Sequence, residues 1–113
     1  MSEILGTIIF QNSVSLPNEG KSLNMNRATQ CTFSIEGTAT SIEVQFEAQS
    51  HKDGLFLPCY CYTLDSEPIV ATQVTTLNDS LWRVDLGSIY SFRTRIVNIS
   101  GGYVNIIGTV GQV

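Results

Sequence analysis

Two stretches of the sequence decide the fold: Phe46–Pro58, FEAQSHKDGLFLP, and Trp82–Val110, WRVDLGSIYSFRTRIVNISGGYVNIIGTV. The first is an alternating strand that enters a turn at Lys52-Asp53-Gly54. The second contains a Trp-led strand, a turn, an Arg-bearing strand, a turn at Gly101-Gly102 and a last strand. Because apolar and polar residues alternate with period two, both stretches predict an antiparallel β-sandwich whose last two strands form a hairpin.

The rest of the chain repeats this alternation, and no stretch offers a helical face. Turns rich in Gly, Pro and Asn separate the strands at a spacing of roughly 8–12 residues, as in sandwiches and jelly rolls. We therefore expect one all-β domain over residues 1–113, an antiparallel, jelly-roll-like sandwich of about eight or nine strands. The predicted strands are Thr7–Ser13, Ser22–Asn26, Gln30–Glu36, Ile42–Gln49, Leu57–Leu64, Ile69–Thr76, Trp82–Leu86, Phe92–Ile99 and Tyr103–Val110.

The composition excludes several classes of function. Charged residues make up 14% of the chain and the net charge is −4, whereas nucleic-acid binders need clustered Lys and Arg to displace counterions. No segment has the ~18 continuous apolar residues of a membrane span. The first residues do not form a signal peptide, so we expect synthesis in a cytoplasm without secretion.

Residues with catalytic or metal-binding potential are few. His51 is the only histidine and lies beside a predicted turn, where a catalytic base would be poorly held. Cys59 and Cys61 share one face of a predicted strand, and together with Cys31 they form an odd set of three thiols. Core thiols are favoured over a metal site because free cysteine is usually buried. The sequence thus predicts a protein without enzymatic activity, metal or cofactor, and leaves the role of Cys59 and Cys61 open.

Arg93 and Arg95 lie on one face of a predicted strand, and Glu43 and Glu47 lie on the polar face of another. If the two strands are neighbours, these side chains form a cross-strand ladder of opposite charges. Alternatively the two arginines contact another subunit, because arginine is enriched at protein interfaces.

The N-terminal segment is unusually apolar, with Ile4, Leu5, Ile8, Ile9 and Phe10. It is either the first strand of the core or an arm that docks on a neighbouring subunit by strand addition, with residues 1–6 flexible before docking. The core strand is the favoured interpretation.

Three tyrosines are candidates for a glycan-binding face: Tyr60, Tyr62 and Tyr103. Flat aromatic faces on β-sandwiches stack against sugar rings. Tyr60 and Tyr62 alternate with the cysteines and would point to the opposite side of their strand. A carbohydrate-binding module is therefore the alternative function.

A longer pattern in the sequence resembles a known group of proteins. Its parts are Ser50–Pro58 with its Asp-Gly turn, Trp82–Leu86, Ser88–Tyr90, Phe92–Ile96 with its Arg-x-Arg spacing, and Ser100–Gly102. In this order they resemble small β-sandwich structural proteins of tailed bacteriophages and prophages, over about the last two-thirds of the chain. Cys59-Tyr60-Cys61 is not part of that pattern.

The resemblance implies a virion protein of the capsid-decoration, head-fibre or tail-associated type. Such proteins assemble as symmetric oligomers, with a trimer favoured here, and some present a glycan-binding face. The implied partners are other copies of the chain, other virion proteins and a host glycan, and the implied location is the virion.

Overall fold

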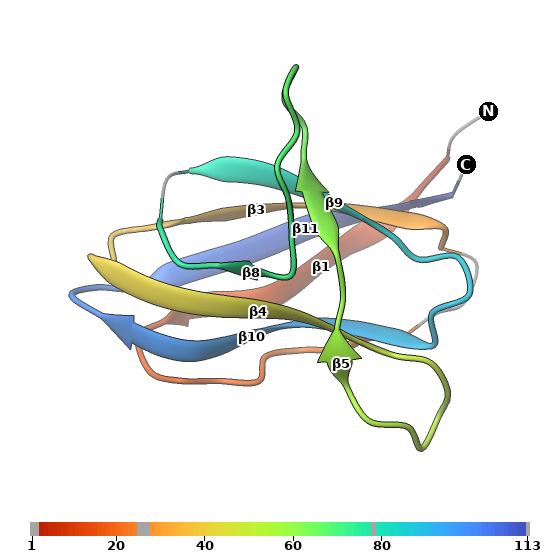
Figure 1. The fold of residues 1–113 in the computed structure, drawn as a ribbon, viewed down its shortest axis with the longest axis horizontal. Helices are drawn as coiled ribbons and strands as arrows, with labels where there is room; N and C mark the ends of the chain where they lie inside the picture. The colour runs from red at the N-terminus through yellow and green to blue at the C-terminus, as the bar shows by residue number, and fades with distance from the viewer. Residues whose placement is uncertain (1–2, 25–27, 78, 113) are drawn as a thin grey trace.

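The computed structural model describes residues 3–24, 28–77 and 79–112, and these residues form an all-β sandwich of two antiparallel sheets (Figure 1). The predicted fold class is therefore confirmed. The described part of the chain contains eleven strands instead of the expected eight or nine.

Six strands form the first sheet, in the spatial order β1, β11, β3, β9, β6, β7. Their bounds are β1 Glu3–Val14, β11 Val104–Gln112, β3 Gln30–Gly37, β9 Ser80–Asp85, β6 Cys61–Thr63 and β7 Val70–Ala71. The second sheet has the order β2, β10, β4, β5, with β8 also paired to β4. Its strands are β2 Leu23–Asn24, β10 Ser91–Ser100, β4 Ser41–Gln49, β5 Leu57–Pro58 and β8 Gln73–Val74.

The core lies between the two sheets and is dominated by aromatic rings. Phe33 is 1% exposed and contacts Phe10, Phe46 and Phe92, with ring centroids 5.5–5.9 Å apart. Trp82 extends this cluster through Phe46 at 5.2 Å. Tilted and edge-to-face pairs of this kind add to the stabilisation from apolar burial. The alternation in β3, β4 and β9 places Phe33, Phe46 and Trp82 inward, as the sequence predicted.

The predicted strand Leu57–Leu64 is wrong, because the chain changes sheets within it. β5 pairs with β4 in the second sheet, whereas β6 pairs with β7 and β9 in the first. Cys59 still donates its N–H to Phe46 O at 2.8 Å, and Cys61 already pairs with Ala71. The crossing therefore occurs around Tyr60, and Cys59 and Cys61 do not lie on one strand.

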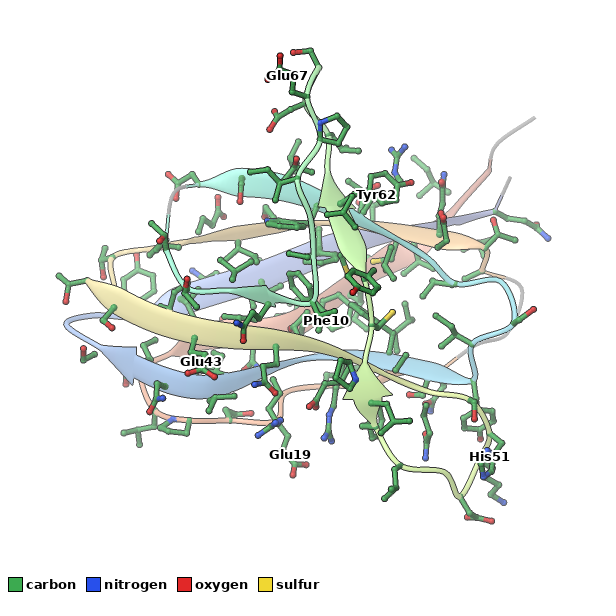
Figure 2. The ribbon with its side chains drawn as sticks, in the orientation of Figure 1. Phe10, Glu19, Glu43, His51, Tyr62 and Glu67 are labelled. Carbon is green, nitrogen blue, oxygen red and sulfur yellow. The ribbon has the colours of Figure 1, made fainter. Side chains whose placement is uncertain are left out.

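The predicted strand Ile69–Thr76 is divided in the same way. β7 belongs to the first sheet and β8 to the second, and Thr72, between them, accepts the N–H of Phe46 at 2.9 Å. Between the two crossings the chain forms the β6–β7 hairpin, which projects beyond the sandwich with Glu67 near its tip (Figures 1 and 2). The short predicted strand Ser22–Asn26 corresponds to β2, although Asn26 lies outside the described residues.

The predicted hairpin at Gly101-Gly102 is also wrong. β10 pairs with β4 and β2, whereas β11 pairs with β1 and β3, so this turn connects the two sheets. Gly101 has φ +79°, and it packs against the neighbouring connection between β3 and β4, where Thr40 donates its N–H to Ser100 O at 3.0 Å. Two sheet-crossing connections thus lie together at one end of the sandwich.

Candidate functional site

The outer face of the five-stranded sheet carries an ordered group of charged side chains on β4 and β10. The register places Arg93 opposite Glu47 and Arg95 opposite Gln45. Arg93 Nε donates to Glu47 Oε1 at 2.9 Å, and Arg95 donates to both oxygens of Glu47 at 3.0 and 3.1 Å. Arg95 Nη2 also donates to Gln45 Oε1 at 2.8 Å. The Glu47 part of the predicted cross-strand ladder is present, and we call Glu47, Arg93 and Arg95 the Glu–Arg cluster.

Glu47 is 6% exposed although it lies on the outer face. Burial alone would raise the pKa of its carboxyl. Hydrogen bonds from Arg95 and Arg93, together with their positive charges, outweigh that effect and hold the pKa below its ordinary value. The carboxylate therefore stays ionised at neutral pH and offers no proton for acid–base chemistry.

Arg93 has two further neighbours outside the pairing with Glu47. The ring of Phe56 lies 3.9 Å from the Arg93 guanidinium carbon, in a cation–π contact. Glu19 approaches the other side of Arg93 at 3.5 Å. Glu43, the second predicted acidic partner, accepts from Asn98 and Gln45 and forms no ion pair among the described residues. No local sequence pattern indicated Phe56, because it lies in the irregular loop between β4 and β5.

The apolar N-terminal candidates lie on both sides of β1. Ile8 and Phe10 are 5% and 2% exposed and belong to the core of the single chain. Leu5 packs against the core and is partly buried. Ile4 is 77% exposed and Ile9 48% exposed. The described part of this segment pairs with β11 of the same chain, as the core-strand interpretation expected.

The three tyrosines do not form one platform. Tyr60 is 70% exposed in the crossing between the sheets, and Tyr62 on β6 donates its hydroxyl to Asp85 Oδ1 at 3.5 Å. Tyr103 lies beside the Gly101-Gly102 connection. The strand pairing places Tyr62 opposite Arg83 of β9, and Arg83 opposite Thr32 of β3. Tyr103 directly precedes Val104, which pairs with Gly37 of β3. Tyr103 is therefore level with Thr38, and six residues along β3 separate it from the level of Tyr62 by ~20 Å.

The three cysteines are poor nucleophiles. Cys31 and Cys61 are fully buried, and burial raises the pKa of the Cys31 thiol to about 12. Burial, and then the nearby thiols and Asp85, also raise the pKa of Cys61. Cys59 is partly buried and its pKa is also raised by burial. No cluster of three or more potential metal ligands occurs among the residues that the structure describes.

His51 lies in an exposed turn, far out on the loop between β4 and β5 (Figure 2). Its carbonyl accepts the N–H of Gly54 at 3.0 Å, and its Nδ1 lies 2.9 Å from the Ser50 hydroxyl oxygen. No acidic side chain among the described residues orients the ring.

No helix that could cross a membrane occurs in the described ranges.

The structure thus defines a small all-β sandwich with one covered charged cluster and open sheet edges. The chain belongs to the XepA family, whose model matches residues 5–110. Its structure is similar to that of SPBc2 prophage-derived protein YomS, with a TM-score of 0.87 and 20% identity over 99% of this chain and 96% of that chain. It is also similar to PBSX exported protein XepA, with a TM-score of 0.88 and 22% identity.

The match to XepA covers 98% of this chain but 38% of that chain, so the sandwich spans well under half of the XepA structure. YomS is named as a prophage-derived protein, in agreement with the phage and prophage origin that the sequence resemblance implies. No curated protein matches the sequence at a significant level.

Proposed function

We propose that the chain is a non-enzymatic structural protein of a phage particle, which self-associates and attaches to the capsid or tail. The family membership supports a phage origin. The observation that carries the proposal is the long edge strand β1, which has no charged residue after Glu3 and whose exposed Ile4 and Ile9 give a surface suited to another protein. The trimer expected from the sequence is one closed assembly of this kind.

The native mass of the purified chain over a wide concentration range tests self-association. We expect a discrete oligomer with a fixed number of copies. A strict monomer at every concentration would contradict the proposal.

Attachment is tested separately, by quantitative mass spectrometry of gradient-purified particles of the encoding phage. We expect the chain at a fixed copy number relative to the major capsid protein, and its absence from the particles would remove this part of the proposal.

A carbohydrate-binding module is the second candidate, favoured by Tyr62, which lies on an outer sheet face beside Arg83 and Asp85. An aromatic ring next to charged hydrogen-bonding groups is a usual arrangement for sugar recognition. A glycan screen with the wild-type chain and a Tyr62→Ala variant tests it. Binding that Tyr62→Ala abolishes would support this function, and the absence of any bound glycan would exclude it.

A further inference from the structure

The outer face of the six-stranded sheet carries a row of side chains that take no part in the core or in the Glu–Arg cluster. Tyr62 on β6 pairs with Arg83 on β9, and Arg83 pairs with Thr32 on β3. All three are partly exposed, and the residues before and after each of them are buried. The row therefore lies on the outer face and spans ~10 Å from the first strand to the third.

Arg83 is held in place but has no counter-charge. Its Nε donates to Thr32 Oγ1 at 3.0 Å, and it forms no ion pair among the described residues. Arg93 and Arg95, by contrast, both bind Glu47. A guanidinium group presents its N–H donors in a planar fork. Because Nε of Arg83 is occupied, Nη1 and Nη2 remain as a pair of donors that can bind both oxygens of a carboxylate.

Tyr62 lies beside this guanidinium group, and its polar end is held by Asp85. Asp85 follows Arg83 by two residues on β9 and therefore lies on the same face. The Tyr62 hydroxyl donates to Asp85 Oδ1 at 3.5 Å, whereas Asp85 and Arg83 do not lie within ion-pair distance of each other. The face thus offers an aromatic ring, an unpaired cation and, next to them, an acceptor for hydroxyl groups.

The neighbouring row of the sheet adds a free amide and a shallow floor. Asp85 pairs with Gln30 on β3, and Gln30 pairs with Gly111 on β11. The side-chain amide of Gln30 is partly exposed and forms no hydrogen bond among the described residues. Gly111 has no side chain to fill the space beside it. A ligand rich in hydroxyl groups can use such donors and acceptors, because each hydroxyl both donates and accepts.

We propose that this face binds an acidic saccharide, a sugar chain that carries a carboxylate, and that Nη1 and Nη2 of Arg83 bind that carboxylate. The inference rests on the carbohydrate-binding function proposed above and names its ligand class. Tyr62 packs against a sugar ring, while Asp85 and Gln30 bind neighbouring hydroxyl groups.

The charge of the ligand follows from the charge of Arg83. A neutral sugar would leave the partly buried guanidinium without a counter-charge, whereas an acidic sugar supplies one through charge-assisted hydrogen bonds. The chain as a whole has a net charge of −4 and therefore does not attract anions by its overall field. Binding of an acidic ligand consequently depends on this one local cation.

Calorimetric titration of the wild-type chain with matched ligands tests the proposal. One pair is sialyllactose and lactose, and the other is trigalacturonate and its methyl ester. We expect each acidic member to bind at least tenfold more tightly than its neutral partner, with an affinity that falls as the salt concentration rises. In NMR spectra, the amide signals of Tyr62, Arg83 and Gln30 should shift, and those of Gln45 and Arg95 on the other sheet should not.

Arg83→Gln tests the cation directly. We expect this variant to lose at least tenfold in affinity for both acidic sugars and to bind the neutral ones as the wild type does. Lys52→Gln is the matched control, because it removes one positive charge from an exposed turn elsewhere on the chain. Its affinity should stay within twofold of the wild type. Both variants should keep the wild-type circular dichroism spectrum.

The possible outcomes separate the ligand class from the function. Equal affinity for the acidic and neutral sugars, or wild-type affinity of Arg83→Gln, would overturn the proposal while carbohydrate binding stands. Equally tight binding of poly-glutamate would show a general anion site and would overturn it as well. If none of the four sugars binds, the proposal is overturned, and the glycan screen decides the carbohydrate-binding function separately. Should Arg83→Gln fail to fold, the wild-type titrations and the NMR shifts still decide.

Discussion

Arg95 binds Glu47 at two points, with Nε donating to Oε1 at 3.1 Å and Nη2 to Oε2 at 3.0 Å. The two residues lie on neighbouring strands, and Arg93 donates to the same carboxylate. A carboxylate that is only 6% exposed is thus compensated by two guanidinium groups. The Glu–Arg cluster joins the two long strands of the five-stranded sheet through their side chains as well as through their backbones.

Glu47→Gln should lower the free energy of unfolding by about 1–3 kcal/mol, because it leaves Arg95 without its counter-charge and Arg93 with only the exposed Glu19. Urea unfolding measures the change. Glu43→Gln is the matched control, since Glu43 forms no ion pair among the described residues, and we expect a change within about 0.5 kcal/mol. Equal losses for the two variants would show that the cluster has no special role.

The stability of the protein should depend on pH through Glu47. The pKa of its carboxyl in the folded state lies below the ordinary value of 4.5. Its stabilising contribution is therefore complete above pH 4.5 and is lost as the pH falls through the lower folded-state pKa. Denaturant unfolding at a series of pH values should show a steeper loss below pH 4.5 for the wild type than for Glu47→Gln. Parallel curves would contradict this assignment.

Gly101→Ala should destabilise the fold by about 1–3 kcal/mol, because Gly101 has φ +79° and an added Cβ would overlap the Thr40 side chain. Gly87→Ala is the control, since a Cβ there meets no atom within 4 Å. We expect it to be neutral or slightly stabilising. Thermal unfolding of both variants measures the difference, and an unchanged midpoint for Gly101→Ala would show that the connection can rearrange freely.

Thiol labelling should distinguish the three cysteines. Cys31 and Cys61 are fully buried and should remain unlabelled in the native protein, whereas the partly buried Cys59 should react slowly. Because burial raises the pKa of Cys59, its reaction should accelerate as the pH rises above 8. All three thiols should react in denaturant. Labelling of Cys31 in the native protein would contradict its buried position in the core.

The sequence predicted the elements whose pattern is local and long. β3 and β4 alternate over eight and nine residues, so their inward faces, and Glu47 as a partner of Arg93 and Arg95, could be inferred from the residues alone, whereas Glu43 as a second partner could not. The side-chain alternation fixes which residues share a face, and two long strands with opposite charges on their outer faces lower the free energy by pairing.

The sequence could not predict which sheet each short strand joins. Leu57–Leu64 has one continuous strand-like pattern, yet β5 and β6 bond to different sheets. The turn at Gly101-Gly102 has the composition of a hairpin, but β11 pairs with β1 and β3, which lie far away in the sequence. Such pairings depend on long-range contacts that no local pattern encodes. The contact of Phe56 with Arg93 was missed for the same reason.

The first and last strands end side by side, because Glu3 is paired with Gln112 in the β1–β11 ladder. The polypeptide consequently enters and leaves the sandwich at a single corner. A module with this geometry can be joined to a linker, inserted in the loop of a carrier or repeated in tandem without threading any chain through the core. The response to force follows as well, because tension applied at the two ends would separate β1 from β11 one backbone hydrogen bond at a time.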